Sequence, residues 1–214
     1  VQPVPFAMLD QNQGLVLYRT ILTGHKSGKL KVTELHDYAT VFLNGKYIGT
    51  LDRREGIQGL ELPAGKEAYP VLDILVEGMG HINFAQEIID RKGITDRVTL
   101  NGMTLMNWEA FTLPLTATTT AQLQRNEVSL ERPGVFFSGS FNLSRVADTY
   151  LDLSGYTKGM VWVNGHCLGR YWNIGPQQSL YCPAGFMKEG ENEILVFDLH
   201  QTGPEKIRGM KAPE

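Results

Sequence analysis

The sequence contains few of the features that mark specialised classes of proteins. Its 214 residues include only two cysteines, too few for the disulfide framework of a small secreted domain. No apolar run approaches the roughly 18 residues of a transmembrane helix, so we expect no membrane partner. The net charge of −3 provides no basic surface for nucleic acid. The first residues lack an initiator methionine and a signal-peptide pattern, which indicates a part of a longer protein.

The sequence also lacks the common signatures of catalysis. It has no Gly-x-Ser-x-Gly elbow, phosphate loop, His-Glu-x-x-His pair or dinucleotide-binding glycine pattern. Asp148 and Asp152 are close in sequence, but two acids do not make up the dense run of oxygen ligands found in a calcium loop. We therefore expect no catalytic residue, no metal site and no cofactor in these residues.

The most informative feature is a stretch that occurs twice. Residues 41–49, VFLNGKYIG, return as residues 161–169, VWVNGHCLG, at an offset of 120. Both copies contain Asn-Gly, the pair preferred in the type I′ turn of a β-hairpin because both turn residues need φ > 0. At the same offset, 12 of the 36 residues from 41 to 76 are identical. A period this long predicts two copies of one domain rather than a solenoid of short repeats.

Short strands alternate with turn residues along both halves of the chain. Apolar or alternating runs predict strands near residues 14–22, 29–34, 41–49, 60–62, 69–77, 98–105, 134–141, 150–153, 161–169, 179–182 and 193–199. Residues 82–89 have helical spacing over about two turns, and the polar tail from residue 201 is expected to be irregular. The pattern predicts an all-β protein in which each half is a sandwich of two antiparallel sheets with jelly-roll or Greek-key connections. Its domains are expected at residues 1–115 and 133–214, with a linker at 116–132.

The two cysteines lie in the second copy of the repeat. Cys167 and Cys182 match Tyr47 and Leu62 of the first copy. Since those positions favour packed side chains, we expect two small buried thiols, with a disulfide as the alternative.

An aromatic segment of the second copy, residues 169–173, has two interpretations. We expect it to be a loop, and we favour a structural role in which the rings of Tyr171 and Trp172 cover one end of the sandwich and the stem of Arg170 packs beside them. The alternative is a carbohydrate site, in which Tyr171 and Trp172 stack on a sugar while Arg170 bonds the sugar hydroxyls. The first copy has Leu51 and Asp52 in place of the two aromatic residues, so a sugar site would belong to the second domain alone.

Several motifs together resemble one family. Residues 158–165 (KGMVWVNG), 168–172 (LGRYW) and 175–177 (GPQ) resemble the C-terminal region of family 35 glycoside hydrolases, the β-galactosidases. Residues 14–20 (GLVLYRT) and 76–84 (VEGMGHINF) resemble the preceding part of the same family. The resemblance implies two tandem jelly-roll β-sandwiches, galactose-binding-like and related by duplication, that pack after a catalytic TIM barrel.

The resemblance also implies where the chemistry is carried out. In that family two barrel glutamates perform retaining hydrolysis of terminal β-galactosides, which requires carboxyl groups about 5–5.5 Å apart. These glutamates lie upstream of the present residues, and neither Glu77 nor Glu87 is expected to replace them. The chain is thus expected to be an inactive C-terminal region whose partner is the N-terminal TIM-barrel catalytic domain of a secreted, periplasmic or lysosomal parent. The alternative function is an autonomous carbohydrate-binding module for galactosides.

One loop is expected to face the barrel. The family pattern after the corresponding strand is close to Glu-Asn-Met-Gly-Arg-x-Asn-Tyr-Gly, in a loop that approaches the active-site rim. The resemblance therefore places four residues at the barrel or at its rim: Met79, His81, Asn83 and Phe84. This chain lacks the arginine and the tyrosine of the pattern, and with them a bidentate donor and a hydroxyl. Domain docking is accordingly favoured over direct contact with substrate.

Overall fold

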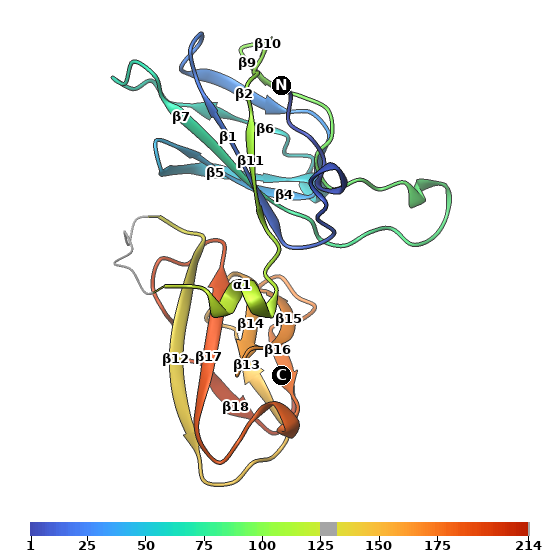
Figure 1. The fold of residues 1–214 in the computed structure, drawn as a ribbon, viewed down its shortest axis with the longest axis vertical. Helices are drawn as coiled ribbons and strands as arrows, with labels where there is room; N and C mark the ends of the chain where they lie inside the picture. The colour runs from blue at the N-terminus through green and yellow to red at the C-terminus, as the bar shows by residue number, and fades with distance from the viewer. Residues whose placement is uncertain (125–131, 214) are drawn as a thin grey trace. The chain divides into compact units, whose positions relative to one another are not determined.

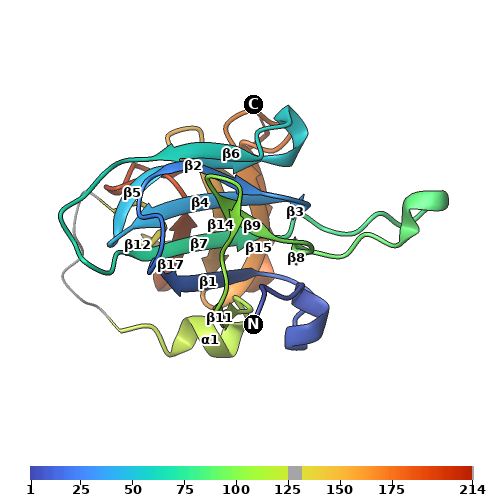
Figure 2. The same ribbon diagram turned by 90° about the horizontal axis from the view of Figure 1, so that it is seen from above.

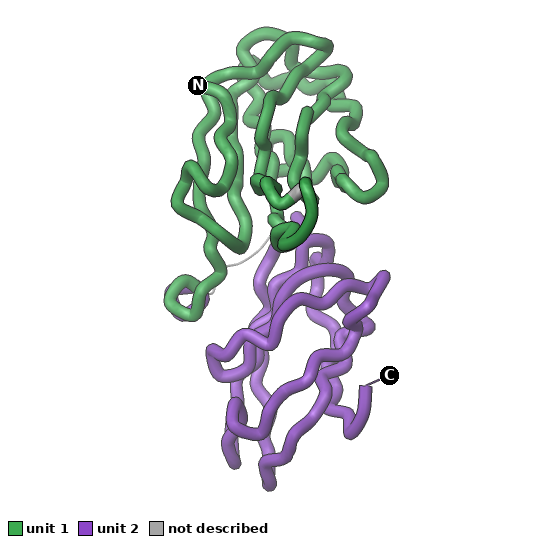
Figure 3. The backbone as a smooth tube through the Cα atoms, turned by 90° about the vertical axis from the view of Figure 1, so that its right-hand side faces the viewer, with its two compact units in different colours: residues 1–119 green, residues 120–214 purple. Residues whose placement is uncertain are grey.

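The computed structural model describes residues 1–124 and 132–213. The chain divides into two compact units, Val1–Thr119 and Thr120–Glu214 (Figure 3). Antiparallel strands dominate both units (Figures 1 and 2), which confirms the predicted all-β fold. Among the described residues, no helix is of a length and apolarity that would let it cross a membrane.

Unit 1 is built from two main sheets that enclose an apolar core. The five-stranded sheet has the order β11 (Glu109–Leu113), β1 (Leu15–Ile21), β7 (Val71–Glu77), β4 (Tyr38–Leu43) and β5 (Lys46–Asp52). The four-stranded sheet has the order β10 (Met103–Thr104), β9 (Val98–Leu100), β2 (Gly28–Val32) and β6 (Gly59–Leu62). A small ladder joins β3 (Leu35–His36) to β8 (Gly93–Ile94), and three 3₁₀ turns complete the unit: η1 (Phe6–Leu9), η2 (Arg53–Glu55) and η3 (Gln86–Ile88). Buried side chains from both main sheets form one cluster, as alternating inward residues should.

Unit 2 repeats this arrangement with fewer strands. One sheet has the order β12 (Val135–Leu143), β17 (Gly190–Asp198), β14 (Lys158–Val163) and β15 (His166–Trp172). The other has the order β16 (Ser179–Cys182), β13 (Thr149–Asp152) and β18 (Arg208–Met210), and a 3₁₀ turn, η4, covers Ala184–Phe186. Inward residues of both sheets form the core, among them Val161, Tyr171, Leu180 and Val196.

The two units share one topology, which confirms the duplication. Strands β1, β7, β4 and β5 are neighbours in the same order as β12, β17, β14 and β15, and β9-β2-β6 corresponds to β18-β13-β16. Both hairpins shift register at the same place, Val41/Phe42 and Val161/Trp162. The turn residues Asn44 and Asn164 have φ of 51° and 47°, as the Asn-Gly pairs predicted.

The offset of 120 does not hold in every strand. Val41 pairs with Ile74 whereas Val161 pairs with Val196, so Ile74 and Val196 occupy equivalent places at an offset of 122. The sequence match of residues 74–76 with 194–196 is therefore not a structural match. A slide of two residues is tolerated because side chains alternate with a period of two, so every side chain keeps its face.

Two local predictions were wrong, the short helix at residues 82–89 and the irregular tail from residue 201. Residues 82–89 contain no α-helix, only the 3₁₀ turn η3. Within the range predicted as a linker, Ala117–Ala121 form the helix α1. Residues 125–131 of that linker lie outside the described residues. The expected irregular tail includes β18, which pairs with β13. This pairing is helped by Arg208, whose Nη2 donates to Asp152 Oδ2 at 2.8 Å; Asp148 instead accepts from the amide of Ala184.

The cysteines differ from each other. Cys182 is buried in the core of unit 2, as its match to Leu62 predicted, and burial raises the pKa of its thiol to about 11. Cys167 is exposed, so the prediction of two buried thiols was wrong for this residue. Both cysteines are free thiols.

Candidate functional site: an apolar arm on a buried ionic root

Between β7 and β8 the chain leaves the body of unit 1 and returns as a long excursion, residues 78–92, called the arm below. Figures 1 and 2 both show the arm projecting from unit 1, with η3 near its tip. Four large apolar side chains on it are exposed: Ile82 (40%), Phe84 (81%), Ile88 (59%) and Ile89 (81%). Exposed apolar groups gathered on one segment are typical of an interaction surface.

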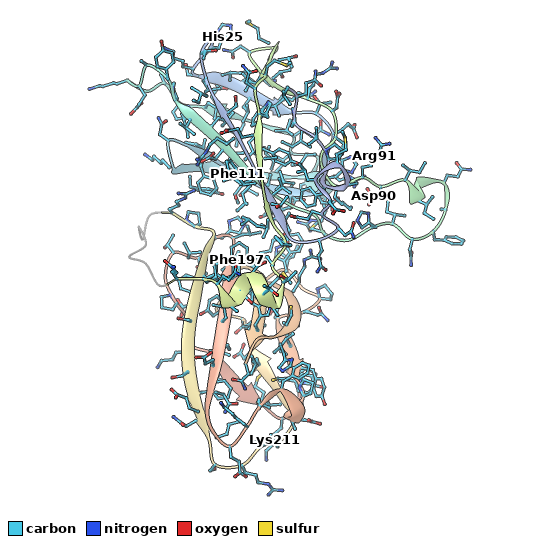
Figure 4. The ribbon with its side chains drawn as sticks, viewed as in Figure 1. His25, Asp90, Arg91, Phe111, Phe197 and Lys211 are labelled. Atoms are coloured by element: carbon cyan, nitrogen blue, oxygen red, sulfur yellow. The ribbon has the colours of Figure 1, made fainter. Side chains whose placement is uncertain are left out.

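The root of the arm is a buried ionic cluster. Lys92 Nζ donates to Asp37 Oδ2 at 2.8 Å and to Asp90 Oδ2 at 2.6 Å. Arg53 Nη1 donates to the second oxygens of the same two carboxylates at 2.9 and 3.1 Å. Figure 4 shows Asp90 and Arg91 where the arm joins the body. Asp37, Asp90 and Lys92 are each at most 6% exposed, so water screens the two ion pairs of Lys92 weakly.

The cluster fixes the ionised form of both carboxyl groups. Burial alone would raise the pKa of Asp37, but bonds from Lys92, the Met79 amide and Arg53 outweigh it and hold the pKa below its ordinary value. The pKa of Asp90 is lowered for the same reasons, with burial opposing and Lys92 and Arg53 prevailing. Both ends of the arm are thereby attached to the body of unit 1.

The same cluster has the composition of a metal site, but its charge is already balanced. His36, Asp37 and Asp90 each offer a ligand atom, and these atoms lie within 4.8 Å of one another. Two carboxylates face one ammonium and one guanidinium at hydrogen-bond distance, and Lys92 bridges both carboxylates. A cation would have to displace the ammonium, so we assign the cluster a structural role.

The four residues predicted at the barrel or rim all lie on the arm, but in two places. Met79 and His81 are at the root: the Met79 amide donates to Asp37 Oδ2 at 2.8 Å, and His81 Nδ1 donates to the carbonyl oxygen of Asp90 at 3.0 Å. Asn83 and Phe84 lie farther along and are exposed. The arm therefore has two parts, a root that positions it and an apolar part available for contact.

The three residues predicted to bind sugar do not form an aromatic loop. β15 continues through Trp172, so alternate side chains point to opposite faces of the sheet. Tyr171 faces the core, is 2% exposed, and donates its hydroxyl to Phe197 O at 2.8 Å, with Asp198 Oδ2 at 2.9 Å. This burial contradicts a stacking role for Tyr171 and supports the structural interpretation of that residue.

Arg170 and Trp172 lie on the other face of β15 and are partly exposed. Lys158 Nζ lies 4.2 Å from the centroid of the Trp172 ring, at the distance of a cation–π contact. Lys158 therefore covers part of the Trp172 ring, and a sugar could stack only on the part of the ring that Lys158 leaves uncovered.

Sequence reasoning missed the ionic root and three apolar residues of the arm. Ile82, Ile88 and Ile89 were assigned to a short helix because their spacing is helical. The charges of residues 90–92 were visible in the sequence, but their burial was not, since their partners Asp37 and Arg53 come from elsewhere in the chain.

Two tandem antiparallel sandwiches of common topology define the chain as a pair of β-sandwich domains, and comparison with known proteins agrees. A family model described as "Beta-galactosidase, first all-beta domain" matches residues 3–114, and one described as "Beta-galactosidase, galactose-binding domain" matches residues 134–192. The chain belongs to the β-galactosidase family, of which it represents a non-catalytic part.

Full-length relatives extend over most of the chain. Beta-galactosidase 1 of Dictyostelium discoideum is 33% identical over 94% of it, Beta-galactosidase of Xanthomonas manihotis 37% over 84%, and human Beta-galactosidase-1-like protein 2 38% over 91%. The match spans only 33%, 30% and 30% of those relatives, about a third of their length.

Proposed function

We propose that this chain is the C-terminal, non-catalytic region of a β-galactosidase, which supports a TIM-barrel catalytic domain and shapes the rim of its active site. The parent protein hydrolyses terminal β-D-galactosyl residues with retention of configuration, using two glutamates outside these residues. The order of the two family matches and the lengths of the relatives support this proposal.

The observation that carries the docking role is the arm. Its apolar side chains Phe84 and Ile89 are each 81% exposed, although a soluble protein gains about 1.5–3 kcal/mol by burying such a side chain. Its root, by contrast, is held by ion pairs of Lys92 and Arg53 with two buried carboxylates. A rigidly rooted segment with an apolar end is suited to bind a neighbouring domain, and Asn83 and Phe84 are the residues we place against the barrel.

The test uses the full-length protein with Phe84 and Ile89 replaced together by serine. If the arm is buried against the catalytic domain, the variant should lose about 2–5 kcal/mol of stability and its arm amides should exchange with deuterium faster. The value of kcat/KM on a chromogenic β-galactoside should fall as the rim loosens. The matched control is Tyr69→Ser, at an exposed aromatic residue (68%) of unit 1 outside the arm. Equal stability and equal arm exchange in wild type and variant would reject docking by the arm.

Two further measurements test the non-catalytic role of this chain and the retention of configuration by the parent protein. The 214-residue chain alone should be inert on the chromogenic β-galactoside, and measurable turnover would overturn the non-catalytic assignment. In the full-length protein, proton NMR of the early product should show β-galactose before mutarotation. An α-anomer formed first would exclude retention.

A second candidate function is carbohydrate binding by unit 2, which the description of the family model over residues 134–192 supports. The partly exposed side chains that would serve this function are Arg170 and Trp172. Titration calorimetry with galactose should then give heat that Trp172→Ala abolishes and Tyr181→Ala, at an exposed tyrosine on another sheet, retains. No heat at millimolar galactose would remove this function.

A further inference from the structure

Unit 2 contains an open groove between its two sheets, here called the β12 groove. Its volume is about 500 Å³. Apolar side chains line the interior, notably Phe137, Phe141, Leu151 and Ile207, whereas Arg145, Asp148 and Glu205 contribute charge. The middle of β12, Ser138 to Ser140, borders the groove and is exposed. A packed interior rarely leaves so large an apolar space.

Unit 1 fills the equivalent space with its own chain. After β9 and β10, Trp108 joins the buried core cluster that also contains Leu100, and Leu105 packs against this cluster. Thr20 of β1 donates its hydroxyl to the carbonyl oxygen of Met106 at 2.8 Å, which attaches this segment to β1. The segment then continues as β11, which pairs with β1 over five residues.

Two glycines account for much of the space in unit 2. Leu30 pairs with Leu60 and Leu100, whereas its equivalent Leu151 pairs with Leu180 and Gly209. Gly209 therefore stands where unit 1 has Leu100. The second glycine follows from the offset of 122 between β7 and β17, which makes Ile194 the equivalent of Leu72. Ile194 pairs with Gly139 and Leu72 pairs with Thr20, so Gly139 stands where unit 1 has Thr20. Both glycines line the groove.

The backbone edge beside the groove is also open. β1 lies between β7 and β11, but β12 pairs only with β17 within residues 1–124 and 132–213. An exposed strand edge presents a row of N–H and C=O groups that another strand can pair with. Apolar pockets beside such an edge accept alternate side chains of the added strand.

We propose that a strand of the same polypeptide, from outside residues 1–214, pairs with the free edge of β12 and inserts apolar side chains into the β12 groove. This strand would fill the space between the sheets of unit 2 and pair with the edge of β12, as residues 105–113 fill the core of unit 1 and pair with β1. The inference rests on the proposed function, since it requires the longer parent chain that the threefold greater length of the relatives supports. An extended segment with apolar residues at alternate positions is the occupant that fits.

The first test is hydrogen–deuterium exchange on the full-length protein. Amides of β12 that do not bond to β17 should exchange as slowly as those of β1, at least about tenfold slower than amides of an unpaired edge. Rapid exchange along β12 in the full-length protein would overturn the inference.

A groove-filling variant tests the site directly. A Cβ on Gly139 would meet only Ile194 Cγ2, at an ordinary 3.5 Å, so Gly139→Leu should fold while its side chain occupies the groove. The variant should displace the inserted side chains and raise β12 exchange about tenfold. The control Gly185→Leu, at an exposed glycine with no atom within 4 Å of its Cβ, should leave β12 exchange unchanged. Unaltered β12 exchange in both variants would count against the inserted strand.

Photo-crosslinking identifies the occupant. Benzoylphenylalanine at position 141 of the full-length protein should crosslink to a peptide from outside residues 1–214 of the same molecule. Mixing isotopically heavy and light protein separates this result from a crosslink to a second copy, which would overturn the inference. The inference would also be overturned if β12 were protected from hydrogen exchange only after galactose is added, because this would indicate a sugar in the groove.

The exchange data also separate this inference from the proposed function. A protected arm with a rapidly exchanging β12 would reject only the inserted strand. A rapidly exchanging arm with a protected β12 would reject docking by the arm and retain the strand.

Discussion

Unit 1 and unit 2 share a sandwich frame, yet they differ in the connection that follows one inner strand and at one edge of the sandwich. Unit 1 extends the connection after β7 into the arm, whereas unit 2 proceeds from β17 to β18 through only nine residues, 199–207. Unit 1 closes its inter-sheet space with residues 105–113, whereas unit 2 leaves the β12 groove open. The difference shows that the duplicated frame tolerates change in loops and at sheet edges while its hairpins and inner strands stay constant.

The units also differ in how they use buried charge. Unit 1 buries two aspartates and a lysine at the root of the arm, and the cluster serves the arm rather than the sandwich. Unit 2 buries Asp198, whose carboxylate accepts bonds from the amides of Thr157, Lys158, His200 and Gln201 and thus organises two turns of the frame. The comparison can be tested by disturbing one unit at a time.

The largest effect is expected from Lys92→Met. Removing the ammonium leaves two buried carboxylates with Arg53 as their strongest remaining donor, and breaking a buried ion pair from one side costs about 3–5 kcal/mol. The loss can be measured by urea denaturation followed by hydrogen exchange, with the amides of β7 reporting on unit 1 and those of β17 on unit 2. Only unit 1 should lose stability. Lys66→Met, at an exposed lysine, is the matched control. A loss below about 1 kcal/mol would mean that the cluster does not hold the arm.

Acid should weaken unit 1 through the same cluster. The pKa values of Asp37 and Asp90 lie below the ordinary value of 3.8, so the unfolded chain binds more protons in acid than the folded chain does. Their stabilising contribution is therefore complete above about pH 4 and is lost progressively as the pH falls below that value. The urea midpoint from pH 6 to pH 2.5 measures this loss. Asp90→Asn should flatten the dependence in unit 1, and an unchanged slope would contradict the assignment.

A smaller effect is expected in unit 2 from Tyr171→Phe. The variant keeps the ring in the core but removes the hydroxyl that donates to Phe197 O, which costs about 1–2 kcal/mol. The control Tyr181→Phe, at a tyrosine that is 47% exposed, should be nearly neutral. If Tyr171→Phe instead weakened galactose binding at unchanged stability, the structural role of this residue would be wrong.

The smallest effect compares the two hairpin turns. Asn44 Oδ1 accepts a bond from the Val71 amide, while Asn164 bonds the Glu193 amide, Phe186 O and Asn192 Oδ1. Glycine adopts the positive φ of both turns but forms none of these bonds. Asn164→Gly should therefore destabilise unit 2 about 1 kcal/mol more than Asn44→Gly destabilises unit 1. Equal losses in parallel urea titrations would show that the additional bonds contribute nothing.

The parts of the fold that were predictable are those specified locally. Asn44-Gly45 and Asn164-Gly165 determine their own turns, and alternation identifies the inner strands without reference to distant residues. The slide that places Val196 opposite Val161 was invisible, because a shift of two residues leaves the alternation intact. β18 was missed because it is short, has no fully buried side chain, and pairs through its backbone and the exposed Arg208.

The candidate site was only partly predictable for a related reason. Residues 79–84 were singled out by their motif, and the structure places them on the arm, although what they contact stays a proposal. The root depends on Lys92 meeting Asp37 across 55 residues of sequence, which no local pattern encodes. Tyr171 and Trp172 are neighbours in sequence, but alternation along β15 places their side chains on opposite faces of the sheet. They therefore cannot stack on the same sugar.

The ionic root has a consequence for limited proteolysis. A protease that cut the arm between Phe84 and Gln86 would leave one end held by the Met79 amide on Asp37 and the other by Lys92 on both carboxylates. The nicked unit should therefore stay folded, with its two fragments separating only in denaturant. The arm is a segment that can be severed without being lost.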